Sequence, residues 1–198
     1  MPDKPDLAAL LGSRICHDLI SPIGAIGNGV ELLMMEGSTK SPEIALISDS
    51  VTHANARIRF FRVAFGMSGG DQRVGRAEVM AILTDLTRGG RLTIDWNSPP
   101  DLNRRDVKLA FLLIQCLETA LAYGGNITLT QTDGRWLITG RAPKLKIDAA
   151  LWEVLVNPAA VIEIGPAQVQ FLLVPEEFSR QHRRLTAHVS ETEIRLSF

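Results

Sequence analysis

The sequence predicts an α+β fold in two parts, an N-terminal antiparallel helical hairpin followed by an α/β sandwich. Two long stretches before residue 68 carry apolar residues at helical spacing, and a glycine-rich break follows at 66–71. Helical and alternating patterns then mix to the end of the chain. Because 198 residues suffice for two small domains, we predict domains at 1–68 and 72–198.

The first helix is predicted over 4–35, and the second over 42–67 with Ser41 as N-cap and Pro42 in its first turn. Apolar residues of the first helix recur mostly in steps of three and four: Leu7, Leu11, Ile15, Leu19, Ile26, Val30 and Leu33. Those of the second follow a heptad pattern: Ile44, Ile47, Val51, Ala54, Ile58, Phe61 and Phe65.

These apolar stripes are wider than one hairpin can cover. Two hairpins side by side in a homodimer, as a dimeric four-helix bundle, would cover them. The alternative is that the hairpin packs on the second domain of its own chain. We predict the homodimer.

The second part of the chain alternates helices and strands. Helices are predicted at 76–87, 103–122, 148–156 and within 168–181, where Pro175 would start or interrupt the helix. Strands are predicted at 91–96, 126–131, 136–140, 185–189 and 193–197. The strongly apolar helix 103–122 is expected at the centre of a two-layer sandwich.

Composition excludes several classes of partner. The net charge of −1 gives no electrostatic reason to expect nucleic acid or an anionic membrane. Cys16 and Cys116 lie far apart in sequence, which predicts reduced thiols in a cytoplasmic protein. The sequence shows no secretory pattern and no apolar run of about 18 residues.

His17 lies opposite the apolar face of the first predicted helix. At about 100° per residue it points away from Ile15 and Leu19, hence to solvent. Small or polar residues on the same side would let another protein approach, with Ile20 at the edge: Ser13, Arg14, Ser21, Gly24 and Asn28. A lone exposed histidine is usually a solvated residue, but the string His17–Pro22 weakens that interpretation.

The string H-D-L-I-S-P at 17–22 resembles the phosphoacceptor box of sensor histidine kinases. The longer string R-I-C-H-D-L-I-S-P-I-G-A-I-G-N-G at 14–29 is more similar still to ChpT-type histidine phosphotransferases of alphaproteobacteria. The resemblance also covers the order of parts, which implies a dimerising hairpin followed by a histidine-kinase ATPase-like domain. Ile20 departs from the basic or polar residue usual in kinases, and suits a docking contact.

The nucleotide site of kinases has no clear counterpart here. Aligned on the kinase pattern, Gln115 and Thr119 occupy the positions of two magnesium-binding asparagines, and 138–143 lacks the aspartate that contacts adenine. The stretch 161–170 holds one glycine, Gly165, where a glycine-rich lid is expected. We expect no cofactor and no ATP binding or hydrolysis. An ATP-dependent histidine kinase is the less favoured alternative.

The resemblance implies that His17 accepts a phosphoryl group from one receiver-domain aspartate and passes it to another. The partners would be receivers of a hybrid histidine kinase and of response regulators, with Mg²⁺ in the partner receiver. Arg14 could steady the phosphohistidine or be solvated, and Asp18 could orient the imidazole or accept its proton. The receiver would contact Ser13, Ile20, Ser21, Gly24 and Asn28.

The remaining candidates carry less weight. His53 lies near the heptad seam and is expected to be structural, and His182 and His188 lack ligand spacing, so no metal site is predicted. A basic patch lies near the C-terminus: Arg180, Arg183 and Arg184. We expect it to be solvated, and the less favoured alternative is that it docks an acidic receiver. The alternative function is a non-catalytic regulatory protein that binds receivers or a kinase through the same hairpin.

Overall fold

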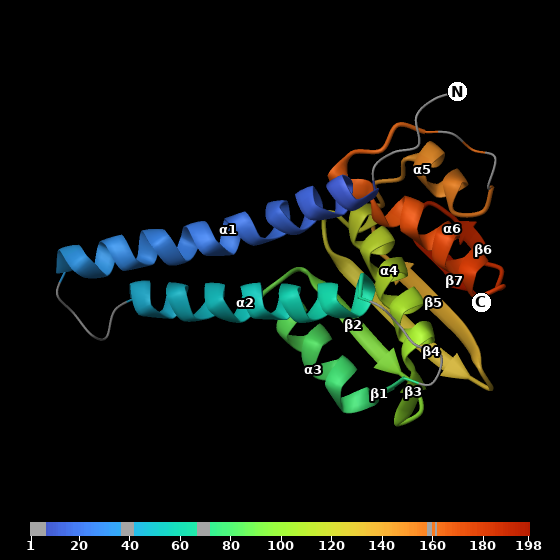
Figure 1. The fold of residues 1–198 in the computed structure, drawn as a ribbon, viewed down its shortest axis with the longest axis horizontal. Helices are drawn as coiled ribbons and strands as arrows, with labels where there is room; N and C mark the ends of the chain where they lie inside the picture. Colours follow the sequence, from blue (N-terminus) through green and yellow to red (C-terminus); the bar gives the residue numbers. More distant parts are fainter. Residues whose placement is uncertain (1–6, 37–41, 67–71, 158–159, 161) are drawn as a thin grey trace.

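The computed structural model describes residues 7–36, 42–66, 72–157, 160 and 162–198 (Figure 1). In the first helix, the side chains at 8–10, 12–13, 16–17, 20, 34 and 36 lie outside this description. None of the described helices combines the length and the apolarity that a membrane crossing needs.

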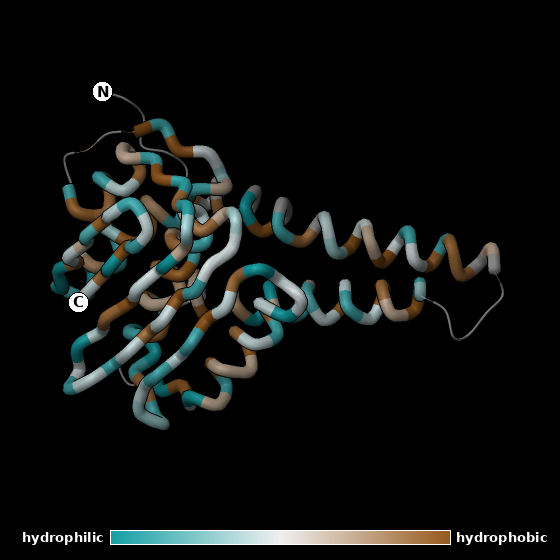
Figure 2. Tube along the Cα trace, turned by 180° about the vertical axis from the view of Figure 1, so that it is seen from behind, coloured by the Kyte–Doolittle hydropathy of each residue, from teal (hydrophilic) through white to brown (hydrophobic). Residues whose placement is uncertain are grey.

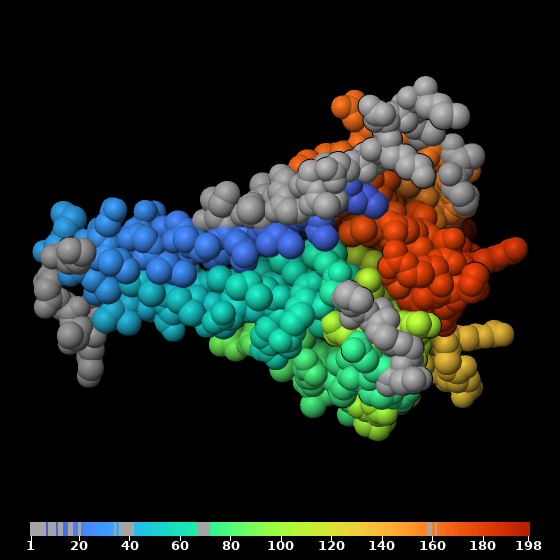
Figure 3. Space-filling model, viewed as in Figure 1, coloured from blue at the N-terminus to red at the C-terminus, as the bar shows by residue number. Residues whose placement is uncertain are grey.

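Two long antiparallel helices, α1 (Leu7–Glu36) and α2 (Pro42–Ala64), lie side by side. Their outer ends project beyond the rest of the molecule (Figure 3). They are in close contact at Gly29, where a Cβ would lie 2.5 Å from Cγ1 of Ile47. The predicted hairpin is therefore present within one chain.

Both predicted helices are present. The predicted start of the first at residue 4 lies outside the described residues, and α1 ends at Glu36, one residue beyond the predicted end. The helix α2 ends at Ala64, short of the predicted 67, and the predicted N-cap Ser41 lies outside the described residues. Pro22 lies inside α1 without ending it.

Five strands form one sheet in the order β2-β4-β5-β7-β6, in which β2 runs parallel to β4 and the other neighbours are antiparallel. Their bounds are Leu92–Asn97 (β2), Gly125–Thr132 (β4), Arg135–Arg141 (β5), Thr186–Val189 (β6) and Glu193–Ser197 (β7). One face carries α3 (Arg76–Thr87), α4 (Arg104–Ala120) and α6 (Gln170–Arg180). The other face is turned to the viewer in Figure 2. The predicted α+β fold is confirmed.

The helix predicted at 148–156 is present as α5 (Ala149–Val154). The other short elements are the 3-10 helix η1 (Pro166–Gln168) and a two-stranded sheet of β1 (Arg73–Gly75) and β3 (Asp101–Asn103). Neither β1 nor β3 was predicted, because three residues carry too little alternation. Pro175 lies inside α6, so the expectation that it starts or interrupts the helix was wrong. Burial of Phe171 and Val174 stabilises α6 despite the missing N–H.

The helix α4 forms the centre of the core, as predicted. Every residue from Val107 to Leu117 is buried, including the free thiol of Cys116, whose burial raises its pKa well above the usual value. Phe60 of α2 stacks on Phe111 of α4 with ring centroids 4.6 Å apart. The base of the hairpin therefore packs on the sandwich of its own chain. This is the arrangement given above as the alternative to the homodimer.

Candidate functional site

His17 belongs to α1, and its side chain lies outside the described part of the structure. Residues four, seven and eleven positions later fall on the same side of a helix with 3.6 residues per turn. All three are exposed: Ser21, Gly24 and Asn28. A Cβ added at Gly24 would meet no atom within 4 Å. The side chains of Ser13 and Ile20, also expected at this surface, lie outside the described part.

Arg14 and Asp18 do not lie on this open strip. Nε of Arg14 donates to Oδ2 of Asp18 at 3.0 Å, and the two side chains are only 13% and 11% exposed. Arg14 also donates through Nη1 to the carbonyl oxygen of Ala167 in η1. The interpretation of Arg14 as a solvated arginine was wrong, because the helical wheel considered the hairpin alone and η1 covers this side of α1.

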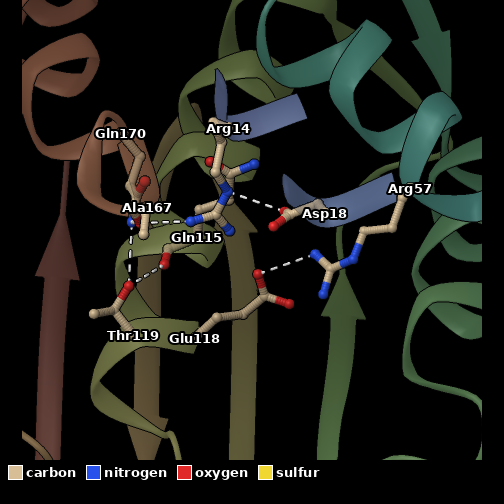
Figure 4. A network of polar contacts seen from close by, with 8 residues as sticks. All are labelled: Arg14, Asp18, Arg57, Gln115, Glu118, Thr119, Ala167 and Gln170. Atoms are coloured by element: carbon tan, nitrogen blue, oxygen red, sulfur yellow. Dashed lines mark hydrogen bonds and ion pairs between the residues drawn. The ribbon is translucent and has the colours of Figure 1, made fainter. Parts of the chain in front are cut away.

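A polar network joins the hairpin to α4 (Figure 4). Nη1 of Arg57, on α2, lies 3.4 Å from Oε2 of Glu118. Nε2 of Gln170 donates to Oγ1 of Thr119 at 3.1 Å and to the Ala167 oxygen at 3.2 Å. The turn of α1 that carries His17 is therefore tied to the sandwich on one side, while Ser21, Gly24 and Asn28 face outward.

A groove of about 390 Å³ lies between the two hairpin helices, beside the position of His17. Its walls come from α1 (Asp18, Ser21, Pro22 and Ala25) and from α2 (Leu46, Asp49, Ser50, His53 and Arg57). The exposed His53 thus lines the groove and is not a structural residue of the heptad seam. Sequence analysis missed Arg57 as well, although its four-residue spacing from His53 was the available signal.

Gln115 and Thr119 lie on α4 beside η1 and the hairpin (Figure 4). Gln115 is 1% exposed, and neither atom of its side-chain amide has a hydrogen-bond partner among the described residues. The Thr119 hydroxyl donates to the Gln115 carbonyl oxygen at 3.1 Å. Of the stretch expected to carry an adenine-reading aspartate, residues 138–141 continue strand β5.

The C-terminal arginines are largely neutralised. Arg180 pairs with Glu176 and Glu177, and Arg183 pairs with Asp106. The described residues hold no group of three or more histidine, cysteine or acidic side chains that could bind a metal ion. The absence of a metal site stays a prediction.

Comparisons with known proteins agree on one family. The family model for the histidine phosphotransferase C-terminal domain matches residues 76–193. The chain is 34% identical over 181 residues to protein phosphotransferase ChpT of Brucella abortus (strain 2308), covering 87% of this chain and 86% of that protein. It superposes on the solved structure of a bacterial phosphotransferase with a TM-score of 0.81 and 30% identity, covering 100% of this chain and 97% of the other.

The resemblance first seen in residues 14–29 thus extends over most of the chain in sequence, and over all of it in fold. The chain belongs to the histidine phosphotransferase family.

Proposed function

We propose that the chain relays a phosphoryl group between receiver-domain aspartates, with His17 as the carrier. The supporting observation is the exposed strip Ser21, Gly24 and Asn28, which shares the side of α1 on which His17 falls. A family member that transfers phosphate needs such an open surface, because the donor and the acceptor are both proteins.

The transfer follows from imidazole chemistry. Nε2 of His17 attacks the phosphorus of a receiver aspartyl phosphate, so that the N–P bond forms as the P–O bond breaks and the aspartate leaves as a carboxylate. A second receiver aspartate then takes the phosphoryl group and restores the imidazole. Free imidazole, with a pKa of about 6.5, is mostly neutral and nucleophilic at pH 7. Mg²⁺ is expected in the partner receiver, and no nucleotide takes part.

Arg14 and Asp18 act as positioning residues in this proposal. Their ion pair and the contact of Arg14 with Ala167 fix the turn of α1 that carries His17. In-line attack depends strongly on such placement. The receiver would dock on Ser13, Ile20, Ser21, Gly24 and Asn28. The cytoplasmic location stays a prediction from the sequence.

We also propose a homodimer, formed through an apolar stripe on the hairpin. The stripe consists of Ile23 and Val30 on α1 and of Ile44, Val51 and Ile58 on α2. Within each helix the stripe residues recur at seven-residue spacing, and all five are 39–58% exposed in the single chain. A second hairpin would cover them in a four-helix bundle.

The test uses the full chain and a phosphorylated receiver. Wild type is expected to gain phosphate that is labile in acid and stable in base, and His17→Ala to gain none while keeping its oligomeric state. His188→Ala is the matched control, because His188 is an exposed histidine on β6. Receiver binding without any phosphate on His17 would overturn the relay and favour a non-catalytic regulator.

A further inference from the structure

A cavity of about 430 Å³ lies where the hairpin meets α4 and the start of β2. It is separate from the groove between the hairpin helices, although Arg57 lines both. It is widely open to solvent, and its volume is in the range of small-molecule sites. Leu92 and Leu121 contribute apolar wall, and polar side chains come from α1, α2 and α4.

The charge of the cavity is positive. Three guanidinium groups line it, those of Arg14, Arg57 and Arg91. Arg14 pairs with Asp18 and Arg57 with Glu118, so the positive charge in excess is that of Arg91. Arg57 and Glu118 are 3.4 Å apart, a long contact for an ion pair. Arg91 is exposed and has no ion pair with any described residue. Arg91 is therefore available to bind an oxyanion, and Arg57 would join it by releasing its long contact with Glu118.

A buried amide adds a second, independent signal. Gln115 lines the same cavity and is 1% exposed, yet its Oε1 and Nε2 lack hydrogen-bond partners among the described residues. A buried amide without partners is destabilising, so native proteins rarely leave one unpaired. Each atom exposes less than 1 Å², so a ligand with an adjacent donor and acceptor would satisfy both only after the Gln115 side chain turns toward the cavity.

We propose that this cavity binds a small organic oxyanion, a carboxylate or a phosphate ester, without a metal ion. The oxyanion lies between Arg57 and Arg91, and a polar group of the ligand pairs with the Gln115 amide. Planar guanidinium groups suit both kinds of oxyanion through paired hydrogen bonds. The site does not include His17, so a test of this ligand site and a test of the phosphoryl relay can fail independently.

Calorimetric titration of the full chain at low salt tests the site. The probes are citrate for carboxylates, adenosine monophosphate for phosphate esters, inorganic phosphate for the bare ion, and adenosine as the uncharged counterpart. Citrate or adenosine monophosphate is expected to bind more tightly than inorganic phosphate and adenosine. Arg57→Ala and Arg91→Ala should each weaken that binding by about tenfold, the usual loss for a charge-assisted contact.

Two controls make the result specific. Arg135→Ala removes an exposed arginine at the far end of β5, and His17→Ala removes the proposed phosphate carrier; both should bind the probe like wild type. The site is overturned if citrate and adenosine monophosphate both bind with dissociation constants above about 1 mM, or if the two arginine variants bind as tightly as wild type.

Gln115→Leu provides a second readout. Removing an unpaired buried amide should raise the melting temperature of the free protein and weaken probe binding. A lower melting temperature would show that the amide already has a partner, and would overturn its assignment to the ligand.

Discussion

Arg14 and Asp18 form an ion pair one helical turn apart on α1, with 3.0 Å between Nε and Oδ2, on the side of the helix that η1 covers. The position of His17 lies between them in the sequence. The pair links the sandwich to the backbone that carries the proposed phosphate acceptor.

Arg14→Ala should lower both stability and transfer rate. The loss of a charged hydrogen bond predicts about 1.5 kcal/mol less free energy of unfolding. Because the helix turn that carries His17 would be misplaced, we expect the phosphoryl transfer rate to fall by about tenfold or more. Urea unfolding and timed transfer from a phosphorylated receiver measure the two effects.

The matched control is Arg88→Ala, which removes an exposed arginine paired with Asp85 at 2.8 Å. It should change stability by less than about 0.5 kcal/mol and leave the transfer rate unaltered. If Arg14→Ala lost stability but transferred at the wild-type rate, Arg14 would have no positioning role.

Ile58→Asp should convert the proposed dimer into monomers. The substitution would bury a carboxylate from each protomer in the apolar stripe, and should raise the dimer dissociation constant by at least about a hundredfold. Light scattering after size-exclusion chromatography gives the mass. Leu137→Asp is the control, since Leu137 is 47% exposed on the sheet and Ile58 is 50% exposed. Equal masses for wild type and Ile58→Asp would show that the apolar stripe does not form a dimer interface.

Two glycines of α1 should respond to alanine in opposite directions. At Gly29 a Cβ would lie 2.5 Å from Cγ1 and 3.0 Å from Cδ1 of Ile47, so Gly29→Ala should push the helices apart and lower the melting temperature. At Gly27 nothing lies within 4 Å, so Gly27→Ala should stabilise by about 1 kcal/mol through helix propensity. Stabilisation by both would mean that α1 and α2 are not in close contact at Gly29.

The buried pair of Lys108 and Glu177 should make stability depend on pH in acid. Their atoms are 3.0 Å apart in side chains 9% and 6% exposed. Burial alone would raise the pKa of Glu177, but hydrogen bonds from Gln181 and Lys108, with the charges of Lys108 and Arg180, outweigh it and lower that pKa.

A carboxyl with a lowered pKa stabilises the fold above its unfolded pKa, and that contribution is lost as the pH falls through the folded pKa. Wild type should therefore lose stability below about pH 4.3, and Glu177→Gln should lose less over the same range. Lys108→Met should cost about 3 kcal/mol at pH 7, because it leaves a buried carboxylate without its closest cation. Parallel pH profiles for wild type and Glu177→Gln in urea unfolding would contradict this assignment.

Long periodic patterns and turn chemistry were readable from the sequence. The helix at 76–87 has the predicted bounds, because its apolar spacing and its flanking residues are local signals. The turn between the predicted strands 126–131 and 136–140 contains Asp133 and Gly134, both with positive φ. The exposure of Ser21, Gly24 and Asn28 also followed from helical spacing alone.

Contacts between distant segments were not readable. Arg14 and Ala167 are 153 residues apart, and no local pattern places η1 over α1. The same holds for His53, whose position in the groove depends on how α2 rotates against α1. Helical spacing gives the faces of a helix, but only packing decides which face is covered.

The stacking of Phe60 on Phe111 has a consequence for how the molecule unfolds. Since hairpin and sandwich share one apolar core, including Phe60, Phe61, Val63 and Ala64 from α2, they should lose structure in a single cooperative transition. A fragment ending at residue 68 would leave those side chains in water. Truncation would therefore disrupt the apolar core that the hairpin and the sandwich share. Point substitutions on the surface of the hairpin would leave that core intact.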